Sequence, residues 1–410
     1  ATAAAIVFPI LAMAKKRFMT EAQNRLEAII QQECTTIHES VKWRFVQEAE
    51  KFMHKQSEQQ QPVFKDIIFN QLYPLYGQMD IKGSSIKRNV AVTKDLFIQI
   101  EGIKKVLNFA FEQTNMPAYE ALIFRLDQHE EELAKGLSAG SEHKMLSFVK
   151  SDINPVLEHL SKGNVVIQTV VEEYTALLDP ELKTIYRERK KYDTSVNKIN
   201  QTLSAYLDEK QEEAQAMYPH YFERYKTDGV EFNMYIGDSI AQNKKFDPVF
   251  LRNLRIWQLV VMCEMEGKFH ALQPELEMPL EVASLILVYN TSLSVHFRMD
   301  EKRFDVEGAY NARYEIIKKR VDKAHIKGTN ERITQPGHIV IVYSQEQDAL
   351  EYTQYIEFLA SKGYLKPNFQ DFALEDLNGV TGLRALRVEV AFTKGHTFDE
   401  IIQSVESLRK

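Results

Sequence analysis

The sequence predicts an α-helical bundle followed by an α+β domain, the two joined by a long coiled helix. In residues 179–217, apolar positions are spaced alternately three and four apart, which is the pattern of a helix that buries one narrow stripe. No segment before Asp179 shows sustained period-two alternation, whereas short β-branched runs separated by turn residues follow Pro279. We therefore expect a helical bundle domain in 1–178, a connecting helix in 179–217 and an α+β domain in 218–410.

The composition is typical of a globular protein with two or three domains. The chain has 410 residues, of which 44% are hydrophobic and 27% charged, and this balance argues against wholesale disorder. A net charge of −7 argues against nucleic acid as a partner. The two cysteines, Cys34 and Cys263, are far apart, so we expect neither a disulfide framework nor a cysteine zinc site, in keeping with a reducing cytoplasm.

The opening of the chain contains an apolar run from Ala3 to Ala14. This run is too short to span a bilayer and has no basic segment before it, so we expect neither a signal peptide nor a membrane anchor. The chain does not begin with methionine, which suggests a fragment. On that interpretation the run is either the buried start of a helix or a connector that continues upstream into another domain.

Residues 15–178 consist of amphipathic stretches separated by polar or proline-containing breaks, and each stretch is expected to be a helix. The first runs from Lys15 to about Gln56. The second starts at Ser84 or Ser85, either of which can cap it, and ends near Gln113. Its expected buried positions are Ile86, Val90, Leu96, Ile100, Ile103 and Leu107. Further helices are expected at about 118–137, 142–160 and 165–178.

The connecting helix carries a heptad seam. Asp179 is expected to cap it, and Pro180 occupies the first helical position, where a backbone N–H is not needed. The seam can pack against the chain itself or against a second copy, so a homodimer through residues 179–217 is one expected assembly. The seam positions are Leu182, Ile185, Arg189, Tyr192, Val196, Ile199, Leu203 and Tyr206.

In the last domain, Asp228-Gly229 predicts a turn within an aromatic-rich segment, and Asp247-Pro248 opens a helix that ends near Leu272. The first two strands after this helix are expected to be joined by a tight turn at Thr291-Ser292. The order β-β-α-β-α-β-β-α suggests an open α+β sandwich, with a ferredoxin-like variant preferred. Strands are expected at 284–290, 293–299, 338–344, 372–374 and 386–392, and helices at 308–324, 347–362 and 397–408.

One candidate anion site lies at the expected start of the second helix. Gly83, Ser84 and Ser85 stand where free backbone N–H groups and the helix dipole favour an anion, and Lys82 and Arg88 lie nearby. The glycine spacing and the GK[ST] ending of a Walker loop are absent. The alternative is a Gly-Ser-Ser helix cap flanked by solvated basic side chains, with Asp80 hydrogen-bonded to the backbone.

A second candidate anion site lies in residues 303–332, the most basic segment of this acidic chain. A helix that carries Lys319 and Lys323 on one face, together with Arg303 and Arg313, could bind a nucleotide, a phosphorylated partner or an acidic domain. The alternative is a solvated helix face on which interleaved acidic residues form i,i+4 pairs.

Two pairs of residues in the same region would serve an enzyme. Tyr310 and Tyr314 either stack on a base or belong to the core. Asp300 or Asp305 would act as a metal ligand or a base. Because no HExxH, GxGxxG or CxxC motif is present, the sequence identifies no metal, cofactor or catalytic residue.

A further cluster consists of His220, Glu223, Asp228 and Glu231. The spacing would place His220 and Glu223 on one face of a helix, where the cluster could bind a metal or perform acid/base chemistry. Only one histidine is present locally. The alternative is a structural hydrogen-bond centre at the junction of two domains.

Three segments of the sequence are long and distinctive: YPLYGQMDIKGSSIKRN, YPHYFERYKTDGVEFNMYIG and FRMDEKRFDVEGAYNARYEIIKKRVDKAHIKGTNERITQPG. Together they resemble the region downstream of the GAF domain in large bacterial multidomain proteins, and the resemblance covers nearly the whole chain. It implies a cytoplasmic sensory or regulatory protein whose GAF domain lies upstream of these residues. It carries over no catalytic or binding residue.

We therefore expect a cytoplasmic regulatory or ligand-sensing module of a bacterial signalling protein, with a nucleotide or another phosphorylated molecule as ligand. The alternatives are an enzyme that acts on a phosphorylated or nucleotide substrate and a protein-interaction scaffold. Convergence of the two basic stretches on one concave pocket would favour a ligand, and exposure of both to open solvent would favour the scaffold.

Overall fold

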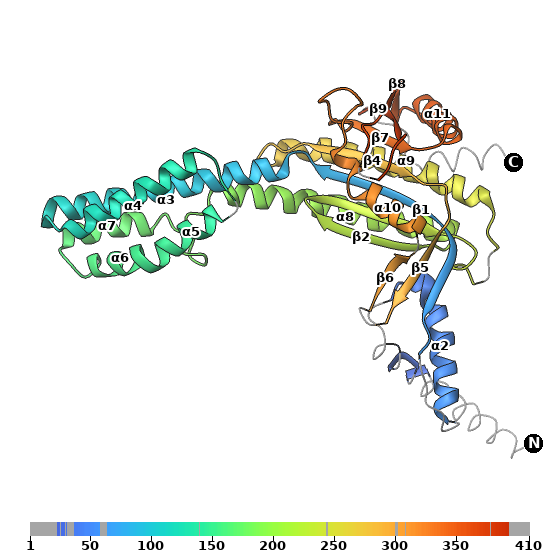
Figure 1. The fold of residues 1–410 in the computed structure, drawn as a ribbon, viewed down its shortest axis with the longest axis horizontal. Coiled ribbons are helices and arrows are strands. Elements are labelled where there is room, and N and C mark those ends of the chain that lie inside the picture. Colours follow the sequence, from blue (N-terminus) through green and yellow to red (C-terminus); the bar gives the residue numbers. More distant parts are fainter. Residues whose placement is uncertain are drawn as a thin grey trace, which may run out of the picture. The chain divides into compact units, whose positions relative to one another are not determined.

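The structure is a computed structural model that describes residues 23, 24, 26–28, 30, 37–57, 64–138, 140–242, 245–299, 302–307, 309–377 and 379–392. Contacts divide the chain into two compact units (Figure 1). The apolar run at 3–14 and the helix expected at 397–408 lie outside the described residues. Unit 1 comprises Ala1–Asp80, Asn200–Ala271 and Val282–Lys410, and unit 2 comprises Ile81–Ile199 and Leu272–Glu281.

Neither unit is one contiguous stretch, whereas the domains expected from the sequence, 1–178, 179–217 and 218–410, were contiguous. That three-way division stays a prediction. Among the helices of the described part of the chain, none is both long enough and apolar enough to cross a membrane.

Strand β1 (Ile67–Ile81) organises unit 1. It lies where the sequence predicted only helices, so the prediction that no strand precedes Asp179 was wrong. The reason is an irregularity in the strand: the pairing register shifts between Phe69 and Leu72, and Gln71 between them has a φ of 56°. This bulge interrupts the alternation of inward and outward side chains, so the period-two pattern is not sustained in the sequence.

The described strands form one nine-stranded sheet. Besides β1 it contains β2 (Tyr221–Thr227), β3 (Gly229–Ile236), β4 (Val282–Val288), β5 (Leu293–Arg298), β6 (Arg303–Glu307), β7 (His338–Tyr343), β8 (Leu365–Ala373) and β9 (Arg384–Val390). The order is β2-β3-β1-β4-β7-β9-β8, with β5 paired to β1 and β6 paired to β5. β1 therefore has three partners, β3, β4 and β5. Ile67 lies opposite Phe297 of β5, and Tyr73 lies opposite Ile236 of β3.

Most of the expected strands are confirmed, but one of their connections is not. β4, β7 and β9 match the strands expected at 284–290, 338–344 and 386–392, and β8 is longer than expected. The predicted hairpin through Thr291-Ser292 is wrong, because β5 pairs with β1 and β6 while β4 runs parallel to β7. The ferredoxin-like variant stays a prediction, and the observed sheet also includes β1, which lies outside residues 218–410.

Helices cover both faces of the sheet in unit 1. On one face, Arg224 of β2 pairs with Asp208 of α8 at 2.8 Å, and α9 packs close to Gly77 of β1. On the opposite face, the Tyr314 hydroxyl of α10 donates to Asn233 Oδ1 of β3 at 2.9 Å. The helices of unit 1 are α2 (Glu39–Ser57), α9 (Pro248–Leu272), α10 (Ala309–Lys318) and α11 (Glu346–Ser361), with the 3-10 turn η3 (Val321–Lys323). α8 (Glu188–Met217) belongs to unit 1 from Asn200 onward, and the 3-10 turn η2 (Gln273–Glu275) belongs to unit 2.

The first expected helix, Lys15 to Gln56, is not continuous among the described residues. Ile37 and His38 are not helical, and α2 begins at Glu39. Within α2 the expected apolar stripe is buried against the core of unit 1. Its fully buried members are Val41, Phe45 and Ala49.

Unit 2 consists mainly of helices that surround one apolar core (Figure 1). They are α3 (Ser84–Thr114), α4 (Pro117–Ala134), α5 (Ser141–Phe148), α6 (Asn154–Leu160) and α7 (Val165–Thr175). The helix expected at 142–160 is divided by a π-helical turn, η1 (Val149–Ile153), which lies just before Pro155. Proline has no N–H to donate and crowds the carbonyl four residues earlier, so the wider turn relieves that conflict.

The connecting helix α8 begins at Glu188, so the prediction that Asp179 caps it was wrong. Asp179 instead closes a separate turn, in which its Oδ1 accepts hydrogen bonds from the N–H groups of Glu181 and Leu182 at 3.0 Å each. Lys183 then adopts a left-handed φ of 54°, which a continuing α-helix does not allow.

The cap of α8 comes from another helix. The carboxylate of Asp95 on α3 is 4% exposed and accepts hydrogen bonds from the N–H groups of Arg187, Glu188 and Arg189 at 2.9 to 3.2 Å. A buried carboxylate at a helix N-terminus satisfies donors that have no partner within the helix and interacts favourably with the helix dipole. The start of α8 is therefore determined by tertiary structure.

The seam of α8 is covered by the chain itself. Leu182 lies before the helix and is 55% exposed, and Arg189 pairs with Glu142 at 2.8 Å. A homodimer through residues 179–217 would need a different face of the helix. The buried seam positions are Ile185, Tyr192, Val196, Ile199, Leu203 and Tyr206.

A buried carboxyl group lies between α9 and β4. Glu266 is 1% exposed, and its Oε1 accepts a hydrogen bond from Ser284 Oγ at 2.6 Å. Burial disfavours the charged form and raises the pKa of Glu266 to about 7.

We predict that Asp95→Ala destabilises the protein by about 1 to 3 kcal/mol, because three N–H groups at a buried helix start lose their acceptor. Urea unfolding followed by circular dichroism measures the loss. Glu101→Ala, an exposed change on the same helix, is the control and should shift the free energy of unfolding by less than about 0.5 kcal/mol. Equal losses in the two variants would contradict the capping role.

We also predict that Glu266 makes the free energy of unfolding fall as the pH rises. Its folded pKa is raised, so its stabilising effect is complete below the unfolded value of 4.5 and is lost as the pH passes through about 7. Glu266→Gln should be more stable than the wild type at about pH 8 by on the order of 2 to 3 kcal/mol. Unfolding curves at about pH 5 and pH 8 test this, with exposed Glu209→Gln as control; a Gln variant that keeps the wild-type pH dependence would rule out this assignment.

Candidate functional site

Helix α3 begins directly after Gly83. Its N-cap residue is Gly83, which has φ 64° and ψ 28°, a conformation that glycine adopts without strain. Gly83 has no side chain that could cap the helix, Ser84 has a partner of its own, and the first turn contains no acidic residue. A Cβ atom built on Gly83 would meet no atom within 4 Å. The prediction that Ser84 or Ser85 caps this helix was wrong, because Gly83 is the N-cap and both serines lie in the first turn. The helix starts where the sequence predicted, and anion binding at this end stays a prediction.

The basic residues around this helix start have different partners. The side chains of Lys82 and Lys87 are exposed. Arg88 instead lies 3.4 Å from Glu142 Oε2, and Arg189 binds the other oxygen of Glu142 at 2.8 Å. Lys82 is anchored through its backbone N–H, which donates to Glu281 O at 2.8 Å. An anion at this end would thus meet exposed lysines, whereas Arg88 is already paired.

The first two turns of α3 do not pack as predicted. Ile86 is 69% exposed and Val90 is 50% exposed, so their assignment to the buried face was wrong. The buried stripe begins at Ala91 and Val92, because only the later turns of α3 contact the core of unit 2. The predicted positions Leu96, Ile100, Ile103 and Leu107 are all buried.

The second basic stretch belongs to unit 1, whereas the first belongs to unit 2. The predicted helix carrying Lys319 and Lys323 on one face was wrong: α10 ends at Lys318, and Lys323 closes the short turn η3. Arg303 and Arg313 are exposed. Arg303 lies on β6 and Arg313 on α10, whereas Lys319 and Lys323 lie beyond the end of that helix.

The enzyme residues proposed in this region are engaged or not described. Asp305 Oδ2 lies 3.7 Å from Arg298 and 3.5 Å from Arg303, within the β5–β6 hairpin. Tyr314 is fully buried and belongs to the core. Asp300 lies outside the described residues, as does the side chain of Tyr310.

His220 lies just before the hairpin formed by β2 and β3, and Glu223, Asp228 and Glu231 lie in that hairpin. The prediction that His220 and Glu223 share a helical face was therefore wrong. His220 is fully buried, and its Nδ1 lies 2.8 Å from Tyr218 O. Burial lowers the pKa of His220 to about 4, so the imidazole is neutral at pH 7. Glu223 accepts a hydrogen bond from the Tyr221 hydroxyl at 2.6 Å. Among the described residues, no group of three or more His, Cys, Asp or Glu side chains is arranged to hold a metal ion.

Sequence reasoning overlooked a GxSxG pattern, which is found around hydrolase nucleophiles, at residues 136–140, GLSAG. Gly136, Leu137 and Ser138 follow helix α4, whereas a nucleophile elbow follows a strand. The Ser138 hydroxyl forms a hydrogen bond with that of Ser141. The position after a helix does not support a hydrolase assignment.

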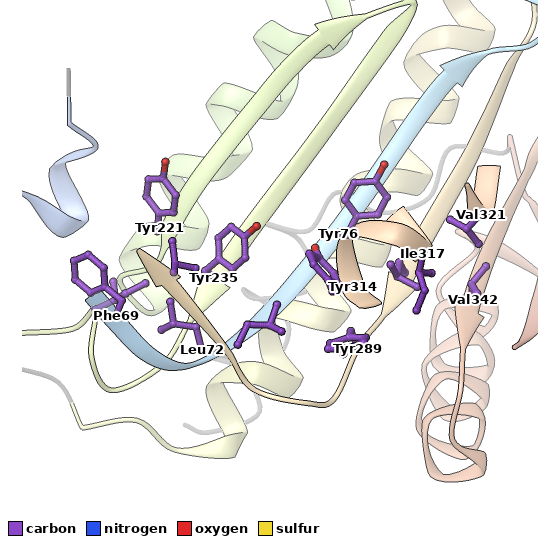
Figure 2. Packing of buried hydrophobic residues seen from close by; sticks show 14 of the residues in the cluster. Phe69, Leu72, Tyr76, Tyr221, Tyr235, Tyr289, Tyr314, Ile317, Val321 and Val342 are labelled. Atoms are coloured by element: carbon purple, nitrogen blue, oxygen red, sulfur yellow. The ribbon is translucent and has the colours of Figure 1, made fainter. Parts of the chain in front are cut away.

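Sequence reasoning missed a polar, aromatic face on the sheet beneath α10. Tyr76 of β1 and Glu223 of β2 both lie opposite Asn233 of β3 in the register, so all three side chains belong to one face. Figure 2 shows Tyr76 and Tyr314 close together on this face, with Tyr221 and Tyr235 farther along it. The signal in the sequence is the alternation of Tyr76 and Gln78 on one strand, but it becomes visible only once the strand pairing is known.

Charges on this face are balanced by a lysine of α10. Lys318 Nζ lies 3.5 Å from Glu231 Oε1, 3.4 Å from Glu315 Oε1 and 5.7 Å from the centre of the Tyr76 ring. Burial raises the pKa of Glu223. Asn233 Oδ1 is satisfied by Tyr314, while its Nδ2 is buried without a partner in the described structure. These contacts hold α10 against β3 of the sheet.

Comparisons with known proteins give limited information. The model of a family described as "YeeD uncharacterised protein" matches residues 90–203. A crystal structure of the guanylyl cyclase Cya2 has a TM-score of 0.28 and 14% identity, covering 50% of this chain and 84% of that chain. A crystal structure of the adenylyl cyclase CyaB from P. aeruginosa has a TM-score of 0.32 and 11% identity, covering 80% and 99%. TM-scores of this size do not establish a shared fold, and no curated protein matches.

We predict that Tyr314→Phe destabilises unit 1 by about 1 to 2 kcal/mol, because Asn233 Oδ1 then lacks its donor in a fully buried position. Tyr225→Phe is the matched control, since that ring is 47% exposed and water can replace its hydroxyl. Chemical unfolding of both variants is the measurement. If Tyr314→Phe were as stable as the control, the network would have no part in holding α10 in place.

Proposed function

We propose that the chain is a cytoplasmic ligand-sensing regulatory module of a bacterial multidomain signalling protein, and that its ligand carries phosphate, as a nucleotide does. The observation that carries the proposal is the N-terminus of α3, a helix of 31 residues with glycine at its N-cap and no acid in its first turn. The GAF domain implied upstream by the sequence resemblance belongs to the same proposal.

The local chemistry suits a phosphate group. The N–H groups of the first turn of a helix have no acceptor within the helix, and the helix dipole favours negative charge at that end. The N–H of Lys87 donates to Gly83 O, and Ser84 has a partner of its own, so we assign anion binding to the N–H groups of Ser85 and Ile86. The exposed ammonium groups of Lys82 and Lys87 add positive charge, and the Ser85 hydroxyl adds a further donor.

The position in the chain suits a sensor. Only Lys82 and Gly83 separate the end of β1 from the start of α3. A ligand bound at the start of α3 would therefore be separated by only two residues of the chain from β1, the strand that organises unit 1. An enzyme acting on a nucleotide would use the same anion site, so turnover of a bound nucleotide would distinguish that alternative.

We predict that Ser85→Asp separates ligand binding from stability. An acidic residue in the first turn should stabilise α3 by about 0.3 to 1 kcal/mol through the helix dipole. The same charge should weaken binding of a phosphate ligand roughly tenfold by repulsion. Thermal shift assays with ATP, GTP, cyclic AMP, cyclic GMP and pyrophosphate, followed by titration of any that stabilise the protein, measure both effects.

Gln128→Glu is the control, because it adds one negative charge to an exposed position on α4 of the same unit. It should leave binding unchanged. The proposal is overturned if none of the five probes stabilises the wild type, or if Ser85→Asp binds them as well as the control does. The protein-interaction scaffold would then be favoured, with exposed Ile86 and Val90 as part of its contact surface.

A further inference from the structure

A cavity of about 210 Å³ opens on the surface of unit 2, between α3 and α7. Its wall is apolar, formed by Val106, Val170, Leu177 and the ring of Tyr174. Tyr174 is 4% exposed, so the ring is fixed in the core rather than lying on the surface. The site predicted from the sequence does not include this cavity.

The cavity depends on a glycine inside a helix. Gly102 lies in the middle of α3, where glycine is less favourable for the helix than alanine. A Cβ atom at this position would lie 2.7 Å from the Tyr174 ring, so any larger residue would displace the ring. Gly102 therefore allows the ring of Tyr174 to lie directly on the backbone of α3 and to form one side of the cavity.

The mouth of the cavity carries a single ion pair. Lys105 Nζ lies 2.8 Å from Glu173 Oε2, and both residues line the cavity. Their side chains are 68% and 57% exposed, respectively. Exposed pairs of this kind contribute little to stability, so a ligand carboxylate could take the place of Glu173 beside Lys105 at little cost.

We propose that this cavity is a binding site for a small aromatic carboxylate. The ring lies against Tyr174 and between Val106 and Val170, and the carboxylate pairs with Lys105. The size is suitable, since an engineered apolar cavity of about 150 Å³ in another protein accepts benzene. Gly102 is about 27 Å along α3 from Ser84 at the usual helical rise, so this site is separate from the proposed phosphate site.

The test uses the full chain and three probes that share one ring but differ in charge: benzoate, benzyl alcohol and benzylamine. Ligand-observed NMR at about millimolar concentration suits the weak binding expected of ligands this small. Benzoate should bind most tightly, and benzylamine should bind roughly tenfold or more weakly, because it meets Lys105 with a like charge. No binding of benzoate, or equal binding of all three probes, would overturn the proposal.

Two variants locate the site. Lys105→Gln should weaken benzoate roughly fivefold to tenfold and leave benzyl alcohol unchanged, whereas Lys144→Gln, an exposed lysine of the same unit, should change neither. Val170→Trp should fill the cavity and abolish binding of all probes; if that variant fails to fold, Leu177→Trp, at a 45% exposed position, serves instead. Benzoate binding that survives a folded cavity-filling variant would place the ligand elsewhere and refute the assignment.

Discussion

The fold of unit 1 depends on the need of strand β1 to satisfy its backbone hydrogen bonds. Its partners are distant in sequence: Ile67 pairs with Phe297, and Tyr73 pairs with Ile236. The bulge at Gln71 lies within the part of β1 that pairs with β5, just before the part that pairs with β3. The strand with three partners therefore comes from the first part of the chain, and the remaining strands come from the last part. Neither part can complete the sheet alone, and contacts of this sequence separation are expected to form slowly during folding.

The elements that the sequence predicted well are those whose pattern is local. α9, α11, β4 and β7 each carry a regular apolar period bounded by proline or polar residues, so they were located from sequence alone. β1 was missed because its bulge breaks the period. The start of α8 was missed because its cap, Asp95, lies on a different helix. In both cases a tertiary contact overrides a local signal, and no single-sequence pattern reports such a contact.

The candidate sites follow the same rule. The helix start at Gly83 was predicted because glycine and serine capping signals are local, although the exposure of Ile86 was not. The polar face around Asn233 was not predicted, because it exists only when three strands and α10 are assembled. The cavity at Gly102 was missed for a related reason. In the sequence an internal glycine only lowers helix propensity, and its role in admitting the ring of Tyr174 is evident only from the folded structure.

Unit 2 has a further property with evolutionary consequences. Most of unit 2, residues 81–199, is one continuous stretch of sequence between β1 and β2, as an inserted domain would be, but residues 272–281 also belong to it. Met278 N donates to Ser195 Oγ at 3.0 Å, and Lys198 pairs with Glu275 at 2.7 Å. A recombination event that moved only the larger block into another gene would leave these contacts behind. Unit 2 is therefore not expected to be transferred between proteins as an independent domain, and its sequence should diversify together with that of unit 1.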